Sequence, residues 1–326
     1  MKKAIMVAVF SLLLIVLVRV PIAAQTLKTV KVTIPRNTIS MLNYPGARDA
    51  GIFRKHGIDI QIDARGFKGF MASFPSRETL VGTPSGLASI ARMNQGLDIV
   101  IIGGGLTVMQ RVVVPKGSPI RSLSDLRGKK LGTFSSAAGS FKTLRTVGLE
   151  GFGIDLIKET KVVVAPPPVL MALLDKGEID AMWNVSSFTI RAASQPGKYR
   201  LVFTPDDYWK ERTGLPLLWS APIVAWRDWI QQDPQRAKGM VAALHESYQW
   251  LRENSDAAIK KYGILAAVKT PAEAKVYKRW LKEKRFFLDR WDSHVIDVQW
   301  KFLEIAKRVG VLSKVPSKEK HTMVLR

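Results

Sequence analysis

Small polar residues gather in five stretches of this sequence, and each stretch follows a run with the pattern of a β-strand. The stretches are PRNTIS (35–40), GFKGF (66–70), GTPSG (82–86), FSSAAGS (134–140) and WNVSS (183–187). Open α/β sheets bind their ligands at the carboxyl ends of their strands. Five such loops therefore predict a ligand-binding cleft whose donors are hydroxyl, amide and backbone N–H groups.

The stretch FSSAAGS indicates how such a cleft would bind a charged group. A helix that begins near Gly139 leaves its first backbone N–H groups without intrahelical acceptors, and the helix dipole adds roughly half a unit of positive charge there. An anion can then take the place of a capping side chain. Ser135, Ser136 and Ser140 would add hydroxyl donors. The alternative is that one of these serines is an ordinary N-cap and the others fill space.

The sequence contains few of the residue patterns that enzymes use. Cysteine is absent, which excludes disulfides, thiolate metal sites and thiol nucleophiles. The four histidines, His56, His245, His294 and His321, lie far apart and form no HExxH motif. GxSxG and GxxxxGKS/T do not occur, and IIGGGLTVM lacks the third glycine of a dinucleotide-binding loop. We therefore predict a protein that is not an enzyme and holds no cofactor and no metal.

The first 24 residues have the pattern of a cleaved export signal. Residues 1–3 (MKK) are basic, residues 4–18 are apolar except for Ser11, and residues 22–24 (IAA) offer a cleavage site of small residues. An uncleaved membrane anchor is the alternative, but the apolar run is short for a span of about 20 residues. We expect a soluble protein of a bacterial periplasm.

Composition limits the choice of partners. The chain has 326 residues, of which 47% are hydrophobic, so it can form about two domains with their own cores. Its formal net charge of +23 could attract nucleic acid or anionic ligands, but export argues against nucleic acid. Between residues 273 and 289 the cations are interspersed with acids, as on a solvated helical face. We interpret the charge mainly as an aid to solubility.

Short β-rich runs alternate with helical runs, which predicts parallel βαβ units in two successive α/β lobes. Strands are expected at residues 30–34, 58–64, 99–102, 111–115, 131–134, 161–165, 180–183, 200–203 and 217–225. Helices are expected from Pro45 to Gly51 and at residues 87–95, 122–128, 141–150 and 169–176. Three amphipathic helices should follow, the first two capped by Asp233 and Thr270 and the third running from about Ser293 to Val309, with Gly310 as its terminator.

The segment VVVPKGSPIRSLSDLRGKKLGTFSSAAGS resembles a succession of motifs in one known family, the periplasmic solute-binding proteins of ABC importers for nitrate, sulfonates and taurine. DAGIFRKHGIDIQI and LLDKGEIDAMW are similar to two further segments of that family. The family also includes binders of thiamine-pyrimidine precursors. The three segments occur in the family's order, and the resemblance covers nearly all of the mature chain.

The resemblance implies an α/β fold of the type II periplasmic-binding-protein class. Each of two lobes would hold a mixed, mostly parallel sheet flanked by helices, with the C-terminal helices packed on the first lobe. After the signal at residues 1–24, lobe I would comprise residues 25–111 and 226–326, and lobe II residues 112–225. The lobes would close around one ligand about a hinge near Arg111 and Ala225.

The resemblance also implies a function without catalysis. A monomer would capture a small organic anion (sulfonate-, nitrate- or carboxylate-like, with or without an aromatic part) and deliver it to the membrane permease of an ABC importer with its ATPase. A thiamine-pyrimidine-precursor binding or synthesis protein of the same fold and a ligand-sensing accessory subunit are the alternatives. The chain departs from the family at Val185, Ser186 and Ser187, and FSSAAGS lacks the usual histidine. These departures concern the ligand more than the fold.

Family contacts and loop chemistry together define the candidate ligand-binding residues. The resemblance assigns ligand contacts to residues 37–40, 82–85 and 135–140. Three aromatic residues, Phe67, Trp183 and Trp219, are candidates to cover an apolar part of the ligand. The complete candidate set is Asn37, Thr38, Ser40, Phe67, Thr83, Pro84, Ser85, Ser135, Ser136, Ala137, Ala138, Gly139, Ser140, Trp183, Asn184 and Trp219.

Overall fold

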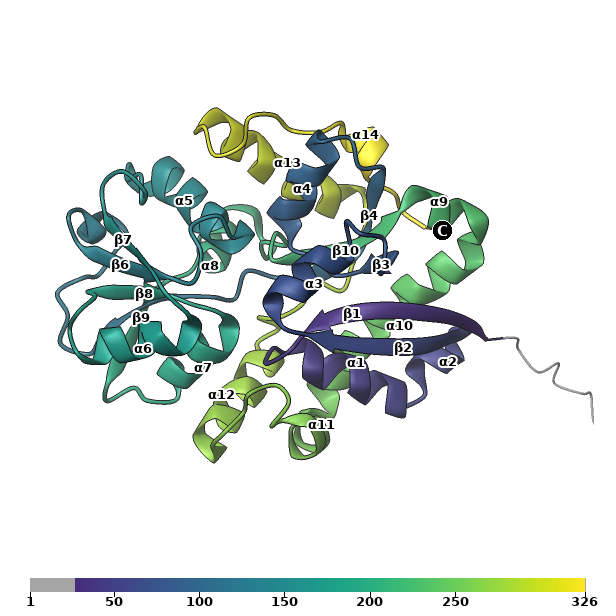
Figure 1. Ribbon diagram of the computed structural model, residues 1–326, viewed down its shortest axis with the longest axis horizontal. Helices are drawn as coiled ribbons and strands as arrows, with labels where there is room; N and C mark the ends of the chain where they lie inside the picture. The colour runs from purple at the N-terminus through teal and green to yellow at the C-terminus, as the bar shows by residue number, and fades with distance from the viewer. Residues whose placement is uncertain (1–26, 326) are drawn as a thin grey trace, which may run out of the picture.

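The chain forms two α/β lobes that lie side by side (Figure 1). A computed structural model describes residues 27–325. The predicted export signal at residues 1–24 lies outside the described residues. Each lobe contains sheets flanked by helices, and the sheets combine parallel with antiparallel neighbours, so the predicted fold class is confirmed.

Lobe I is built on two small sheets. Its strands are β1 (Lys28–Pro35), β2 (Ile58–Arg65), β3 (Val81–Gly82), β4 (Ile99–Leu106) and β10 (Ala221–Trp226). The first two strands pair in parallel, whereas β10 lies between β3 and β4 and is antiparallel to both. The helices between these strands are α1 (Ser40–Asp49), α2 (Ile52–Lys55), α3 (Phe67–Ser73) and α4 (Gly86–Asn94). Each strand except β10 is thus followed by a loop at the same side of the lobe.

Lobe II is built on one five-stranded sheet. Its strands, in their order across the sheet, are β7 (Lys161–Val164), β6 (Lys130–Thr133), β8 (Ala181–Trp183), β5 (Val112–Pro115) and β9 (Tyr199–Phe203). β6 is parallel to both of its neighbours, whereas β5 is antiparallel to both of its own. The helical elements are the 3₁₀ turn η1 (Ser124–Leu126), α5 (Gly139–Phe152), α6 (Pro167–Asp175), α7 (Ser186–Ala193) and α8 (Pro205–Thr213).

The strand expected at residues 217–225 begins later and belongs to the other lobe. β10 starts at Ala221 and pairs with β3 and β4, so residues 221–225 lie in the sheet of lobe I, not in lobe II as predicted. Residues 217–219 are equally buried, but their backbone bonds to side chains: Asp206 accepts from Leu217 N–H, and Gln299 accepts from Leu218 N–H. A continuous apolar run does not reveal which partner each N–H will find.

The first helix begins earlier than predicted. α1 starts at Ser40, so Pro45 lies inside the helix and not at its first position. Proline lacks the N–H that would bond to the Met41 carbonyl. Burial of Met41, Leu42 and Tyr44 offsets this lost hydrogen bond. Proline's preference for the first helical position was therefore a misleading signal here.

Helices at the C-terminal end pack on lobe I and also reach lobe II. They are α9 (Arg227–Gln232), α10 (Pro234–Glu253), α11 (Ser255–Tyr262), α12 (Pro271–Lys282), α13 (Ser293–Arg308) and α14 (Lys318–His321). α10 packs on α1 and α2, as expected, whereas α12 contacts α7 and α13 contacts α5 (Figure 1). The predicted caps are confirmed, because Asp233 accepts from Arg236 N–H and Thr270 from Glu273 N–H.

The histidines are dispersed in the fold as they are in the sequence. His56 bonds to Glu246 at 2.7 Å, and His321 Nδ1 lies 2.8 Å from the Ile99 carbonyl oxygen. His245 is mostly buried, and burial lowers its pKa. Within residues 27–325, no cluster of three or more histidine and carboxylate residues is placed to hold a metal ion. In that same part of the chain, no helix is long and apolar enough to cross a membrane.

Candidate ligand-binding site

Four helices of eight or more residues begin at one cavity between the lobes, beside the shorter α3. α1 and α4 approach it from lobe I, and α5 and α7 approach it from lobe II. The cavity has a volume of about 120 Å³. An apolar cavity of about 150 Å³ accepts benzene, so the inner cavity suits a small organic molecule. Its wall is formed by Pro35, Thr38, Ile39, Ser40, Phe67, Phe70, Thr83, Ser85, Leu106, Met109, Gln110, Phe134, Ala138, Gly139, Ser140, Val185, Ser186, Ser220 and Ala221.

None of these four helices is capped by a side chain. The residues before their first turns, Ile39, Ser85, Ala138 and Val185, make no side-chain hydrogen bond to the helix, and no acidic residue lies in any of the first turns. The backbone N–H groups of Gly139 and Ser140 find no acceptor among the described residues. Unpaired N–H groups at a helix start carry a partial positive charge and favour an anion.

The starts of α4 and α5 touch each other across the two lobes. A Cβ atom added to Gly139 would lie 2.6 Å from the Ser85 hydroxyl oxygen and 3.5 Å from Leu87 Cβ. A side chain at position 139 would therefore have to displace the Ser85 hydroxyl group from its present place between the two helices. Two partially positive helix ends in contact repel each other unless negative charge lies beside them.

Aromatic side chains cover the cavity on its outer side. Phe67 of lobe I contacts Phe134 of lobe II edge to face, with ring centroids 5.9 Å apart. Phe67 is half exposed, at 49%. Both rings also line a wider cleft outside the cavity, of about 600 Å³, so they stand between the inner cavity and this opening.

Two hydroxyl groups contact each other on the lobe I side of the cavity. Thr83 lines the wall, and its Oγ1 lies 3.4 Å from the hydroxyl of Tyr44. Complete burial raises the pKa of Tyr44 to about 12, although the contact with Thr83 opposes this shift. Tyr44 therefore stays protonated, and its hydroxyl can donate to Thr83, which leaves the Thr83 hydroxyl hydrogen free for a ligand.

About half of the candidate residues reach the cavity. Those in its wall are Thr38, Ser40, Phe67, Thr83, Ser85, Ala138, Gly139 and Ser140. Asn37 lines only the outer cleft, where it adopts a left-handed backbone with φ of +60°. Pro84, Ser135, Ser136 and Ala137 line neither space, because they form the turns that lead into α4 and α5. That these four residues contact the ligand stays a prediction.

The remaining three candidates lie in the protein interior and not in the cavity wall, which corrects the prediction that Trp183 and Trp219 cover an apolar part of the ligand. Trp183 and Trp219 are fully buried, and neither belongs to the cavity wall. Trp219 Nε1 donates to the Gln299 carbonyl, and its ring meets Trp300 edge to face. Asn184 is also fully buried and donates to the Pro167 carbonyl at 2.9 Å. Large aromatic side chains at strand ends contribute more by filling the core than by meeting a ligand.

Several wall residues were missed. Phe134 begins the quoted stretch FSSAAGS, and an aromatic residue at a strand end could have been noticed. Val185 and Ser186 lie in the quoted loop WNVSS and were noted as departures from the family, but they were not chosen as candidates, although they form the start of α7 at the cavity. Gln110 has no signal in the sequence, because it lies in an irregular segment between predicted strands. Ser220 was assigned to the strand predicted at residues 217–225, whereas it lies in the turn before β10.

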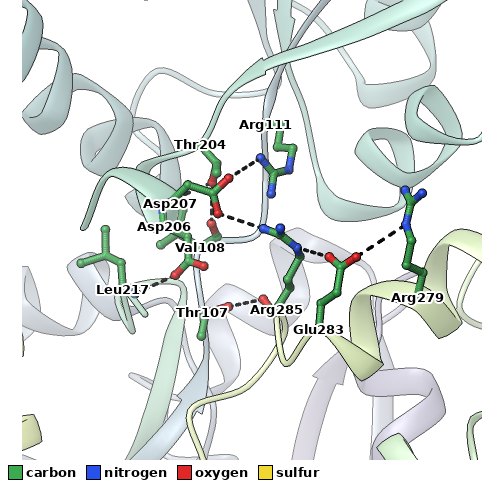
Figure 2. A network of polar contacts seen from close by, with 10 residues as sticks. All are labelled: Thr107, Val108, Arg111, Thr204, Asp206, Asp207, Leu217, Arg279, Glu283 and Arg285. Carbon is green, nitrogen blue, oxygen red and sulfur yellow. Dashed lines mark hydrogen bonds and ion pairs between the residues drawn. The ribbon is translucent and has the colours of Figure 1, made fainter. Parts of the chain in front are cut away.

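Polar contacts join the two segments that cross between the lobes (Figure 2). Asp207 of α8 bonds to Arg111 and to Arg285, each at 2.8 Å. Burial alone would raise the pKa of Asp207, but these guanidinium groups outweigh burial and hold the pKa of Asp207 below its usual value. Thr204 Oγ1 donates to the Val108 carbonyl at 3.1 Å. Residues 107–111 and 204–220 are thus fixed to each other beside the cavity.

Further ion pairs connect the lobes around the cavity. Arg191 of α7 bonds to Glu273 of α12 at 2.9 Å, and the Glu273 side chain is only 4% exposed. Arg308 of α13 bonds to Glu150 of α5 at 2.6 Å. With the Arg285–Asp207 contact, these pairs hold the two lobes in one closed arrangement.

A small cavity enclosed between two α/β lobes that are joined by crossing segments defines the class of two-lobed binding proteins. The chain belongs to the NMT1/THI5-like family, whose sequence pattern matches residues 40–258. The resemblance stated from the sequence is confirmed at this level.

Relatives and solved structures agree with this assignment. Provisionally named binding proteins of Brucella abortus and Brucella melitensis are 22% identical over 225 residues. This match covers 65% of the present chain, and the chain spans 64% of the length of these relatives. The Escherichia coli periplasmic aliphatic sulphonate binding protein SsuA superposes with a TM-score of 0.72 at 16% identity, over 91% of this chain and 92% of that one.

Two further solved structures are similar. The alkanesulfonate-binding protein SsuA from Xanthomonas axonopodis pv. citri, bound to MOPS, gives a TM-score of 0.69 at 15% identity and covers 91% of this chain and 98% of that one. The desulfurization enzyme DszB gives a TM-score of 0.62 at 15% identity and covers 91% of this chain and 96% of that one. At these identities the similarity establishes a shared fold, which occurs in binding proteins and in an enzyme.

Proposed function

We propose that this protein is the substrate-binding component of an ABC importer. It captures a small organic anion between its lobes in the periplasm and delivers it to a membrane permease with its ATPase. The observation that supports this proposal most strongly is the convergence of four uncapped helix starts on one cavity. The family membership and the sulfonate-binding neighbours support it independently.

The positive charge at the cavity comes from backbone N–H groups at the helix starts. No residue of the cavity wall, as far as the described part of the chain extends, has an ionisable side chain. Four helix starts nevertheless supply about half a unit of positive charge each, which is enough to balance one or two negative charges. A fixed array of N–H donors binds an acid group without the cost of ordering long cationic side chains.

The rest of the wall favours an apolar body on the ligand. Phe67, Phe70, Leu106, Met109 and Phe134 present carbon surface. A ligand with its acid group at the starts of α4 and α5 would bury its hydrocarbon part against these side chains and leave water. Sulfonates are the first choice, because the printed names of two neighbours specify them. Carboxylates share the required charge and geometry.

The cavity also favours binding over catalysis. DszB has the same fold, so the fold alone does not exclude an enzyme. General acid–base catalysis requires an ionisable group within hydrogen-bond reach of the substrate, and the wall, in the described residues, contains none. Its hydroxyl groups have no histidine or carboxylate beside them in the wall that could activate a nucleophile.

Calorimetric titration of the purified mature protein tests this function. The ligands are propanesulfonate, benzenesulfonate, benzoate and nitrate, and the neutral molecules propanol and benzenesulfonamide are the matched controls. We expect at least one anion to bind with a Kd in the micromolar range and its neutral control to bind far more weakly. If every anion binds more weakly than about 1 mM, the proposed function is wrong.

A further inference from the structure

Gln110 has a buried amide oxygen that no group in the described part of the protein pairs with. The residue is only 9% exposed and lies in the cavity wall. Its Oε1 atom has no hydrogen-bond partner among the described residues. Buried amide groups are normally paired, since an unpaired one loses its bonds to water without compensation. The cavity is the space into which a partner for this amide can enter.

The other buried glutamine beside the crossing segments provides the contrast. Gln299 is fully buried, its Oε1 accepts from Leu218 N–H at 2.9 Å, and its Nε2 donates to the Pro216 carbonyl at 2.8 Å. Its amide therefore joins parts of the protein. Gln110 has the same side chain and similar burial but no such bond from its carbonyl oxygen, so a structural role does not explain it.

We infer that Gln110 is a specificity-determining residue that pairs with a neutral hydrogen-bonding group of the ligand, separate from the acid group. This inference rests on the proposed function. Gln110 lies in the wall with the apolar Leu106 and Met109 and belongs to none of the four helix starts that would hold the acid. An amide offers one acceptor and two donors, which suit a hydroxyl group. The ligand class is thus an organic acid with a short apolar body and a second polar group.

Contacts of the crossing segments hold the backbone on both sides of Gln110, and Figure 2 shows those made by Thr204 and Arg111. Before it, the N–H of Val108 donates to the Leu217 carbonyl, and Thr204 donates to the Val108 carbonyl. After it, Arg111 is bound to Asp207. The amide is therefore positioned before the ligand arrives, so little conformational entropy is lost on binding. A site that is fixed in this way discriminates strongly against ligands that lack the matching group.

Paired probes test the role of Gln110. Benzenesulfonate is compared with its 2-, 3- and 4-hydroxy derivatives, and propanesulfonate with 3-hydroxypropanesulfonate, by calorimetric titration of the wild type, Gln110→Met and Gln299→Met. The wild type should bind at least one hydroxylated probe about tenfold more tightly than its parent. Gln110→Met should lose that preference, bind the parent at least as well, and have an unchanged or higher Tm. Gln299→Met should keep the preference with a lower Tm.

The outcomes separate this inference from the proposed function. If the wild type binds the parent anions but no hydroxyl group improves binding, or if Gln110→Met keeps the preference, the role of Gln110 is wrong and the proposed function stands. An equal loss of affinity for parent and hydroxylated probes in Gln110→Met also overturns the role. If no anion binds to the wild type, the proposed function fails and this inference fails with it.

Discussion

Helix starts in two regions of the molecule are built in opposite ways. Away from the cavity, five helices are capped by the side chains of Thr204, Asp233, Thr270, Asp292 and Ser317. At the cavity, α1, α4, α5 and α7 have neither a side-chain cap nor an acid in the first turn. A side-chain cap satisfies N–H groups within the protein, whereas an uncapped start can leave some of them available for a ligand, as it does for Gly139 and Ser140 of α5.

The comparison teaches that the location of uncapped helices matters more than their number. Some short helices elsewhere, such as α2 and α9, also lack a side-chain cap. What distinguishes the cavity is that four such starts meet there, two from each lobe. An anion between them would interact with both lobes at once, which favours the closed arrangement over an open one. Four substitutions test this comparison, from the largest expected effect to the smallest.

Gly139→Asp would give the start of α5 its own acid. The new carboxylate competes with a bound anion for the same N–H groups, and the new Cβ would lie 2.6 Å from the Ser85 hydroxyl oxygen. We expect the affinity for the bound anion to fall at least about 100-fold in calorimetric titration, while the circular dichroism spectrum is unchanged. Gly197→Asp is the matched control, because Gly197 is exposed and has open space at its Cβ position. Unchanged affinity in Gly139→Asp would contradict an anion site at α5.

Asp206 allows a test at one of the capped helix starts, through the pH dependence of the free energy of unfolding. It lies in the first turn of the capped helix α8, where burial raises its pKa to about 7. Repulsion from Asp207 adds to this shift, and Leu217 N–H, Arg111 and Lys210 oppose it. The native protein therefore keeps this proton up to about pH 7, whereas the unfolded chain loses it near pH 4. The stability that this group contributes is full below about pH 4 and is lost as the pH rises to 7 and above.

Asp206→Asn should remove the loss of stability that the wild type shows as the pH rises to 7 and above. The amide oxygen can still accept from Leu217 N–H but has no charge at any pH. We expect the free energy of unfolding of the variant to exceed that of the wild type at pH 8, on the order of 2 kcal/mol, and to match it near pH 4. Urea denaturation at several pH values measures this difference. Parallel pH profiles for the two proteins would show that Asp206 does not titrate as described.

Asp233→Ala and Ser85→Ala compare the two kinds of helix start directly. Loss of the Asp233 cap should lower the free energy of unfolding by about 1 kcal/mol and leave ligand affinity unchanged, because α10 starts far from the cavity wall. Ser85 makes no cap bond to α4, so Ser85→Ala should change stability little and reduce affinity several-fold. Denaturant titration and calorimetry distinguish these results. If Ser85→Ala loses stability but no affinity, Ser85 is an ordinary cap.

Local features of the fold followed from the sequence. Asp233 before Pro234, and Thr270 three residues before Glu273, predicted the starts of α10 and α12, because a cap depends on residues at most four positions apart. The small residues of FSSAAGS predicted that α5 begins at a strand end without a large side chain. β10 was the main topological error, because its partners β3 and β4 lie more than a hundred residues away in the chain.

The aromatic candidates differ in whether they are buried in the core or line the cavity. Phe67, Trp183 and Trp219 looked alike as aromatic residues near predicted loops, yet only Phe67 reaches the cavity. Trp219 instead packs against Trp300, which lies 81 positions later in the chain. No local pattern reports such a contact. Gln110 shows the same limit, since an unpaired amide is recognised only when every neighbour is known.

The sequence by itself determined the order of most strands and helices, the capped starts of α10 and α12 and the family, because these depend on neighbouring residues and on motifs in a fixed order. Only the tertiary structure decided which loops meet. The starts of α1, α4, α5 and α7 come from segments as far apart as residues 38 and 186, and packing brings them to one cavity whose wall, in the described residues, has no charged side chain. The positive charge at the site is a property of assembled helices, and it appears nowhere in the composition.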